Sequence, residues 1–397
     1  MATSLVERSA RRSEMGIAIA VYGGFVLNGV VVTLLGPVLP TLSSQWSLTD
    51  VQAGRLFTAQ FLTSILGVVL VSWLLPKWGH RLTLSAGYLL MAAGIGGLGL
   101  GVNSLGLMSV ACYGFGQGVT IPVSNLLVSD WNPERRASAL SVLNFTWGLG
   151  AVICPFFIAF ANQTQSIWSC LTGLAATLAF TALCVAMVPF TPPQSANETP
   201  LTASPAAWSK MFACVLGLLF FLYVGTETAL GGWVASHAKR TGPSDAYMWL
   251  FTPSLFWGSL VLGRGLAPFF LRWVPQKKLV LLDLVVATIG IVVLLSAPSV
   301  TVIGVGSIVA GFGLSSVFPI NVALLSAFGP LATRAAGPMF ALAGLGGGIL
   351  PWLVGLTAAR SGSLRIGLGV PLLATLVMLA LHGLRVVHHG LATGRPD

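Results

Sequence analysis

The chain has 397 residues, of which 8% are charged and 55% are hydrophobic. Soluble globular proteins carry charge on about a quarter of their residues, so this composition excludes that class and indicates a protein that lives in lipid. The formal net charge of +10 at pH 7 is also typical of nucleic-acid binding, and the positions of the basic residues decide between the two explanations.

Runs of sequence without charge predict twelve transmembrane helices, because a bilayer core about 30 Å thick needs ~20 apolar residues per helix. The uncharged stretches are residues 15–49, 56–76, 82–129, 137–197, 284–333, 335–359 and 366–384. Polar breaks divide three of them into two helices each, at residues 103–104, 162–165 and 297–299. Two further spans, 211–236 and 246–271, each contain one charge.

The basic residues gather on one side of this predicted bundle. Twelve spans place both termini on the same side, which carries fourteen basic residues, whereas the opposite side carries five. The fourteen are Arg8, Arg11, Arg12, Lys77, Arg81, Arg135, Arg136, Lys210, Arg272, Lys277, Lys278, Arg334, Arg385 and Arg395. Positive charge concentrates on the cytoplasmic side of membrane proteins, so both termini are predicted to be cytoplasmic and no nucleic-acid partner is expected.

Glycine and proline positions recur in the two halves of the chain, as in transporters built from internal repeats. At an offset of 196 residues, Gly29, Gly36, Gly148, Gly150 and Pro155 fall on Gly225, Gly232, Gly344, Gly346 and Pro351. With two residues inserted, Gly116, Gly118 and Pro122 match Gly311, Gly313 and Pro319. The sequence predicts an all-α membrane protein with a six-helix lobe at 1–190, a cytoplasmic linker rich in Pro, Ser, Thr and Ala at 191–207, and a second six-helix lobe at 208–397.

Two six-helix halves with a central linker resemble the major facilitator superfamily of transporters, and the resemblance covers essentially the whole chain. The family's cytoplasmic loop signature, an acidic residue followed by Gly and paired basic residues, is similar to Pro76-Lys77-Trp78-Gly79-His80-Arg81, where Pro76 replaces the acidic residue. A second family element is similar to Pro133-Glu134-Arg135-Arg136-Ala137. The resemblance implies alternating access between inward-open and outward-open states, with Arg81 and Arg136 as gating residues.

Residues 223–233, in the span at 211–236, resemble the seventh helix of the fucose/proton symporter branch, which includes glucose and other sugar carriers. That resemblance implies a sugar substrate. The branch often has a coupling carboxylate in its first or fourth helix. Here the corresponding spans hold Asn28 in the first and Gln117 and Asn125 in the fourth.

Glu227 is the outstanding ionisable residue, and it is expected toward the outer side of its span. A charged side chain inside a membrane helix costs roughly 2.5 to 3.5 kcal/mol on insertion scales, so a function is expected for it. Three interpretations stay open: coupling of a cation, substrate binding, and a structural anchor in a helix interrupted at Gly225 and Gly231. Arg264 and Asp283 are placed near the cytoplasmic ends of their spans and are interpreted as a gate or a packing pair.

A sugar presents hydroxyls and apolar ring faces, so its carrier needs amides or carboxylates that both donate and accept, and an aromatic plate. Residues of these kinds lie within the predicted spans. The expected substrate-binding set is Asn28, Gln60, Gln117, Asn144, Trp147, Tyr223, Glu227, Trp257 and Asn321. Each amide has the alternative role of an interhelical hydrogen bond, and each Trp that of packing.

These observations predict a secondary transporter that moves a sugar or similar small polar solute by alternating access, alone or coupled to a proton or sodium ion. The alternative is an exporter of amphipathic drugs or lipids, against which the number of buried amides argues. An enzyme is not expected, because the histidines lie at span ends or in a loop and no phosphate-binding loop occurs. We expect a monomer in the plasma (bacterial inner) membrane, with no cofactor and no metal.

Overall fold

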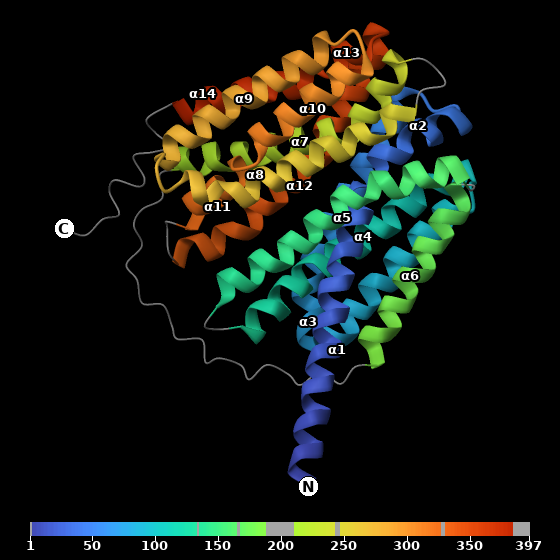
Figure 1. The fold of residues 1–397 in the computed structure, drawn as a ribbon, viewed down its shortest axis with the longest axis vertical. Coiled ribbons are helices and arrows are strands. Elements are labelled where there is room, and N and C mark those ends of the chain that lie inside the picture. Colours follow the sequence, from blue (N-terminus) through green and yellow to red (C-terminus); the bar gives the residue numbers. More distant parts are fainter. Residues whose placement is uncertain are drawn as a thin grey trace, which may run out of the picture. The chain divides into compact units, whose positions relative to one another are not determined.

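The computed structural model describes residues 2–132, 135–164, 167–187, 210–242, 247–326 and 330–383, and all regular structure within these ranges is helical (Figure 1). The helices are α1 (Ala2–Thr33), α2 (Leu35–Gln45), α3 (Asp50–Gly99), α4 (Asn103–Trp131), α5 (Arg136–Thr164), α6 (Ile167–Met187), α7 (Lys210–Thr241), the 3-10 helix η1 (Tyr247–Phe251), α8 (Thr252–Phe270), α9 (Gln276–Ser296), α10 (Val300–Leu314), α11 (Val317–Ser326), α12 (Pro330–Ser361), α13 (Leu364–Gly367) and α14 (Gly369–Gly383). The predicted linker at 191–207 lies outside the described residues, so the lobe boundaries stay a prediction.

The described helices make twelve crossings, because three crossings consist of two helices each and one helix contains two. The paired helices are α1 with α2, bent by 43° at Leu34, α10 with α11, and α13 with α14. The 50-residue α3 changes direction at Gly79, whose φ of 69° favours glycine. Eight described helical segments, two of which are the α10–α11 and α13–α14 pairs, are long and apolar enough to cross a membrane, and the bent α1–α2 pair would make nine. The predicted all-α fold of twelve helices is confirmed.

Apolar side chains cover the outer faces of these helices, as expected for contact with lipid. On α6, Phe180, Leu183 and Met187 are 65%, 58% and 80% exposed, whereas Leu171 and Leu178 on the same helix are buried. In water such a surface would favour association with other molecules, but in a bilayer it is the ordinary lipid-facing surface.

The chain divides into two compact units. The first unit comprises Met1–Leu34 and Leu62–Asn197, and the second comprises Leu35–Phe61 and Glu198–Asp397. Two of the divisions fall in the first half of the sequence, at the bend between α1 and α2 and inside α3. The second unit therefore contains α2 and the first turns of α3 in addition to α7 through α14.

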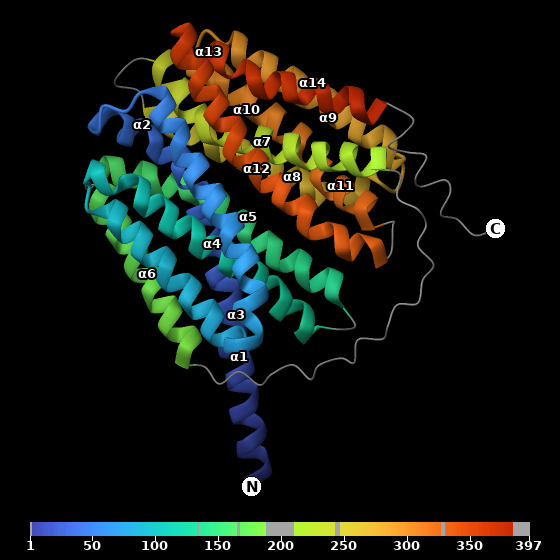
Figure 2. The ribbon, with the colours of Figure 1, turned by 180° about the vertical axis from the view of Figure 1, so that it is seen from behind.

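In the first unit, α1 and α5 lie side by side (Figures 1 and 2), and glycines form their contact. A side chain added at Gly29 on α1 would overlap the backbone carbonyl of Trp147 on α5. In the same way, one added at Gly150 on α5 would overlap the carbonyl of Val26 on α1. Helices in lipid gain little from apolar burial and associate by close backbone approach, so these glycines have a packing role.

The second unit repeats this arrangement with α7 and α12, which lie beside each other in Figure 2. Gly225 on α7 faces Leu350 and the carbonyl of Gly346 on α12, and Gly346 in turn lies against the carbonyl of Phe221. Gly29 and Gly150 recur 196 positions later as Gly225 and Gly346. The sequence repeat therefore corresponds to one helix pair built twice.

A second repeated contact corrects the matching of one glycine group. Gly116 on α4 packs on Gly87 and Met91 of α3, and Gly313 on α10 packs on Asp283 and Ala287 of α9. On the partner helices, Asp283 and Ala287 of α9 lie 196 positions after Gly87 and Met91 of α3. Gly116 therefore corresponds to Gly313, and the predicted match with Gly311 is wrong by two residues. The contact with the preceding span is what the two units share.

Candidate functional site

Tyr223, Glu227 and Arg264 form one polar cluster inside the second unit. Arg264 Nη2 donates to Glu227 Oε1 at 2.8 Å and to Tyr223 Oη at 3.0 Å. Tyr223 Oη donates to Glu227 Oε1 at 3.3 Å, which closes a triangle of hydrogen bonds. The guanidinium therefore compensates the charge of Glu227 within the span.

Two helices position this cluster. Tyr223 and Glu227 are four residues apart on α7 and share one helical face, and Arg264 reaches them from α8. Glu227 is 9% exposed, and the ring of Phe318 from α11 lies with its centroid 5.5 Å from that of Tyr223. These low-dielectric surroundings strengthen the attraction between the two charges.

The interpretation of Arg264 and Asp283 as a pair is wrong. Arg264 pairs with Glu227, and Asp283 on α9 instead accepts a hydrogen bond from Ser316 Oγ. The sequence placed Glu227 toward the outer side of its span, but α7 extends from Lys210 to Thr241, so Glu227 lies near its midpoint. The ion pair with Arg264 brings the two charges to the same depth.

The expected interruption of the helix at Gly225 and Gly231 is also not observed, because α7 is continuous over 32 residues. The glycines instead make room for neighbouring side chains. The indole of Trp257 on α8 lies where a side chain of Gly231 would be, and the ring of Phe57 on α3 does the same at Gly232. Glycine here permits close packing without breaking the helix.

The other predicted site residues of the second unit are buried. Trp257 is 6% exposed, and Gln60 on α3 and Asn321 on α11 are fully buried. Neither the amide nitrogen nor the amide oxygen of Asn321 has a hydrogen-bond partner among the described residues. A buried amide without partners is costly, so Asn321 retains its full capacity to bind a polar ligand.

In the first unit, Asn28 belongs to a network that joins three helices. Its Nδ2 donates to Tyr88 Oη on α3 at 3.1 Å and to the carbonyl of Gly24 at 3.3 Å. Thr120 Oγ1 on α4 donates to Asn28 Oδ1 at 2.7 Å. Protein groups therefore occupy this amide, as expected for an interhelical hydrogen bond. The sequence reasoning missed Tyr88 and Thr120, whose hydroxyls gave no signal by themselves.

The remaining predicted residues of the first unit differ in exposure. Gln117 is 3% exposed and lies one turn before Thr120 on α4. Asn144 on α5 is exposed and donates to the carbonyl of Leu140 in its own helix at 2.8 Å. Trp147, one turn further along α5, is half-buried, and its backbone carbonyl lies where a side chain of Gly29 would be.

A sequence model of the Major Facilitator Superfamily matches residues 21–351 of the chain. The chain belongs to the Major Facilitator Superfamily. It is therefore a multi-pass membrane protein and a secondary transporter, not an enzyme. The resemblance inferred from the loop motifs is confirmed at the level of the superfamily.

Known transport proteins are similar to the chain over most of its length. It is 22% identical over 385 residues to Sodium-dependent glucose transporter 1 of Danio rerio, an alignment that covers 85% of this chain and 64% of that protein. The chain thus spans less than two thirds of that relative.

Among solved structures, a bacterial homologue of the human lysosomal transporter Spinster has a TM-score of 0.80 at 14% identity, covering 97% of this chain and 99% of that one. The fucose:proton symporter of E. coli has a TM-score of 0.60 at 18% identity, covering 94% of this chain and 98% of that one. Likeness at these identities shows the shared fold alone.

The superfamily's cytoplasmic loop motif lies at the change of direction in α3. Arg81 is exposed there, and His80 Nε2 lies 3.8 Å from Asp130 Oδ2 near the end of α4. Arg136 begins α5, but its side chain lies outside the described residues. Pro76 replaces the acidic residue of the motif, and Asp130 is the acidic group that the described residues bring to this loop.

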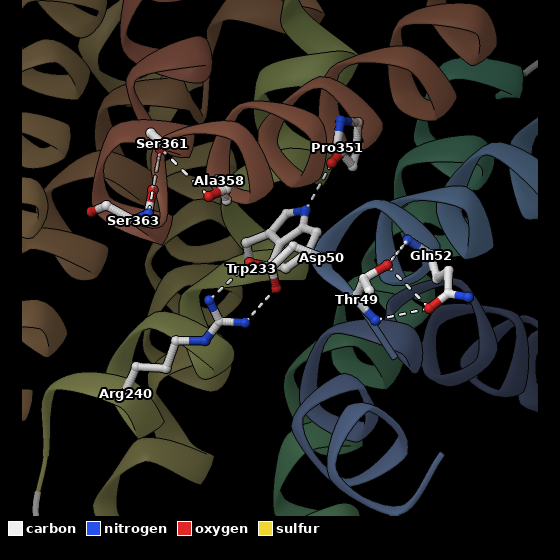
Figure 3. A network of polar contacts seen from close by, with 9 residues as sticks. All are labelled: Thr49, Asp50, Gln52, Trp233, Arg240, Pro351, Ala358, Ser361 and Ser363. Carbon is white, nitrogen blue, oxygen red and sulfur yellow. Dashed lines mark hydrogen bonds and ion pairs between the residues drawn. The ribbon is translucent and has the colours of Figure 1, made fainter. Parts of the chain in front are cut away.

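A polar network lies at the far end of α7, where that helix meets α3 (Figure 3). Arg240 forms a two-pronged ion pair with Asp50, in which Nη1 lies 3.0 Å from Oδ2. Trp233 Nε1 donates to the carbonyl of Pro351 at 3.0 Å. Thr49 and Gln52 form a reciprocal cap, because Thr49 N donates to Gln52 Oε1 at 2.9 Å and Gln52 N to Thr49 Oγ1 at 3.3 Å. These two hydrogen bonds form a capping box that fixes the start of α3.

Proposed function

We propose that this transporter carries a sugar or a similar small polyhydroxylated solute, and that the cluster of Tyr223, Glu227 and Arg264 forms part of its binding site. The observation that carries the proposal is an ion pair inside a membrane-spanning helix bundle that still has unused hydrogen-bonding groups. Arg264 Nε is buried and has no hydrogen-bond partner among the described residues. The Arg264 side chain as a whole is 28% exposed, so part of it is accessible.

The groups on the neighbouring helices fit the same class of ligand. Arg264 Nε is a donor, and the amide of Asn321 both donates and accepts, as a hydroxyl-rich ligand requires. Trp257 on α8 and Tyr223 on α7 supply aromatic faces for the apolar side of a sugar ring. An amphipathic drug would leave these polar groups unpaired, which costs binding free energy.

Glu227 is the proposed coupling residue. A proton that binds Glu227 removes the negative charge opposite Arg264, so the guanidinium is free to donate to substrate hydroxyls. Loss of that proton restores the ion pair and weakens substrate binding. This exchange would link protonation of Glu227 to substrate affinity.

The predicted contacts of the first unit, Asn28, Gln117, Asn144 and Trp147, and Gln60 of the second unit, remain part of the proposal, as do the gating roles of Arg81, Arg136 and Arg264. The names of the zebrafish glucose transporter and the bacterial fucose symporter support a sugar and a coupling ion. One chain supplies both helical repeats, which favours a monomer, and we propose the plasma (bacterial inner) membrane as its site of action.

The test is uptake of a radiolabelled hexose panel into proteoliposomes, with and without imposed proton and sodium gradients. Saturable uptake of one hexose, absent from protein-free liposomes, is the expected result. Accumulation driven by a gradient would establish symport, whereas equilibration alone would indicate facilitated diffusion. No hexose flux together with movement of an amphipathic fluorescent dye would favour the exporter instead.

A further inference from the structure

Asp283 is a second carboxylate within a span, and its charge is not balanced in the way that Arg264 balances Glu227. It lies on α9, is 7% exposed, and accepts a hydrogen bond from Ser316 Oγ. Among the residues whose side chains the structure describes, no Lys, Arg or His forms an ion pair with Asp283. A carboxylate buried in this way is stable only when a proton or a cation joins it.

The helices around α9 offer little positive charge. α10, α11 and α14 pack against α9, and within the described residues their one titratable side chain is that of His382, buried near the end of α14. His382 forms no ion pair with Asp283. Lys277 and Lys278, in the first turn of α9, are exposed, and neither forms an ion pair with Asp283. A counter-charge for Asp283 therefore has to come from solution.

Asp283 on α9 lies against the neighbouring span where that span is divided into α10 and α11. α10 ends at Leu314 and α11 begins at Val317, so Ser315 and Ser316 lie in the break. Gly313, in the last turn of α10, packs directly on the backbone of Asp283. The last carbonyls of a helix lack intrahelical donors, and such half-helix ends coordinate sodium ions or protons in transporters. The break therefore sets the hydroxyl of Ser316 against the carboxylate of Asp283.

The two helix ends do not compensate the carboxylate themselves. The end of α10 is partially negative and the start of α11 is partially positive, so their fields oppose each other at the break. Packing does not require the carboxylate either. In the first unit the position equivalent to Asp283 is Gly87, which packs against Gly116 in the way that Asp283 packs against Gly313. The carboxylate of Asp283 is therefore an extra group at a helix contact that the first unit forms with glycine at this position.

We propose that Asp283 and Ser316, at the break between α10 and α11, form a binding site for a monovalent cation, either a sodium ion or a proton. Among the described residues, no hydrogen bond or ion pair joins Asp283 or Ser316 to Glu227 or Arg264. Only the use of this cation to drive transport rests on the proposed function. Cation binding itself requires neither a sugar nor any other substrate.

The test uses the purified full-length protein in lipid nanodiscs without substrate. Binding of radioactive sodium is measured by scintillation proximity, and protonated carboxyl groups are followed by infrared spectroscopy between acidic and alkaline pH. We compare the wild type with Asp283→Asn, with Ser316→Ala, and with Asp130→Asn, a matched control on α4 whose side chain is 40% exposed. Size-exclusion profiles report whether each variant is folded.

A sodium site predicts saturable binding that Asp283→Asn abolishes and that Ser316→Ala weakens about tenfold, as expected for loss of one ligand to a charged group. A proton site predicts no sodium binding but a titrating buried carboxyl band that is absent from Asp283→Asn. The Asp130→Asn control retains the wild-type signal in both cases. Unchanged cation binding in a folded Asp283→Asn, or neither signal in the wild type, would overturn the proposal. If Asp283→Asn does not fold, unchanged binding in Ser316→Ala decides against it.

These outcomes are independent of the substrate. Cation binding without hexose flux would leave the site intact and reject the sugar. Hexose flux without cation binding would support the sugar and reject the cation site.

Discussion

Arg264 Nη2 on α8 lies 2.8 Å from Glu227 Oε1 and 3.0 Å from Tyr223 Oη, so a single nitrogen joins two side chains of α7. In this geometry each of the two charges is compensated by the other. Transport and stability should therefore respond differently to the loss of one charge and to the loss of both.

Replacement of Glu227 by Gln should reduce gradient-driven uptake about ten- to hundredfold, because a charge-assisted hydrogen bond and the titrating group are lost together. The variant should remain folded, since Gln is nearly isosteric. Uptake into proteoliposomes over a range of pH measures the effect. Tyr223→Phe, which retains both charges, is the control and should keep its pH dependence. Wild-type uptake with an unchanged pH profile in Glu227→Gln would rule out the coupling role.

Replacement of Arg264 by Met should lower the free energy of unfolding by about 3 to 5 kcal/mol, because Glu227 is left as an unpaired buried charge. The double variant Glu227→Leu with Arg264→Met should lose less than Arg264→Met alone, because it leaves no unpaired charge. Thermal unfolding in one detergent compares the three proteins. A double variant less stable than the single one would contradict an ion pair between these residues.

Replacement of Gly29 by Ala should destabilise the protein by about 1 to 3 kcal/mol, because the new methyl group overlaps the carbonyl of Trp147 and forces α1 away from α5. Gly173→Ala on α6 is the matched control, since a side chain there meets no atom within 4 Å. The control should be neutral or slightly stabilising. Equal unfolding temperatures of the two variants would show that the α1–α5 contact tolerates a side chain.

Replacement of Asn28 by Leu should lower the free energy of unfolding by about 1 to 3 kcal/mol, because the hydroxyls of Tyr88 and Thr120 lose their buried partner. If the amide serves only to join the helices, the apparent substrate affinity of the folded variant should stay near that of the wild type. Thermal unfolding and the concentration dependence of uptake separate the two effects. A large loss of affinity at unchanged stability would instead assign Asn28 to the substrate.

The sequence was sufficient for the helices and for their repeated packing. Uncharged runs separated by polar breaks predict the twelve crossings because lipid admits few charges, and backbone approach requires glycine at Gly29 and Gly225. The offset of 196 residues thus reflects the same close helix contact in both units, and it is visible in the sequence.

The pairing of charges could not be predicted in the same way. Whether Arg264 meets Glu227 or Asp283 depends on the depth and rotation of α7, α8 and α9, which the sequence does not specify. The continuity of α7 was missed because glycine both interrupts helices and admits neighbours such as Trp257. The spacing of Tyr223 and Glu227 was the one available signal, and it identified their common face without showing what lies opposite.

The difference between Gly87 and Asp283 at equivalent positions has an electrical consequence. A cation that neutralises Asp283 adds one positive charge to each cycle of a carrier for an uncharged solute, and the other unit adds none. Transport would then generate current, and the membrane voltage would act on it directly. At 100 mV one charge is worth about 2.3 kcal/mol, which sustains a solute gradient of about fiftyfold.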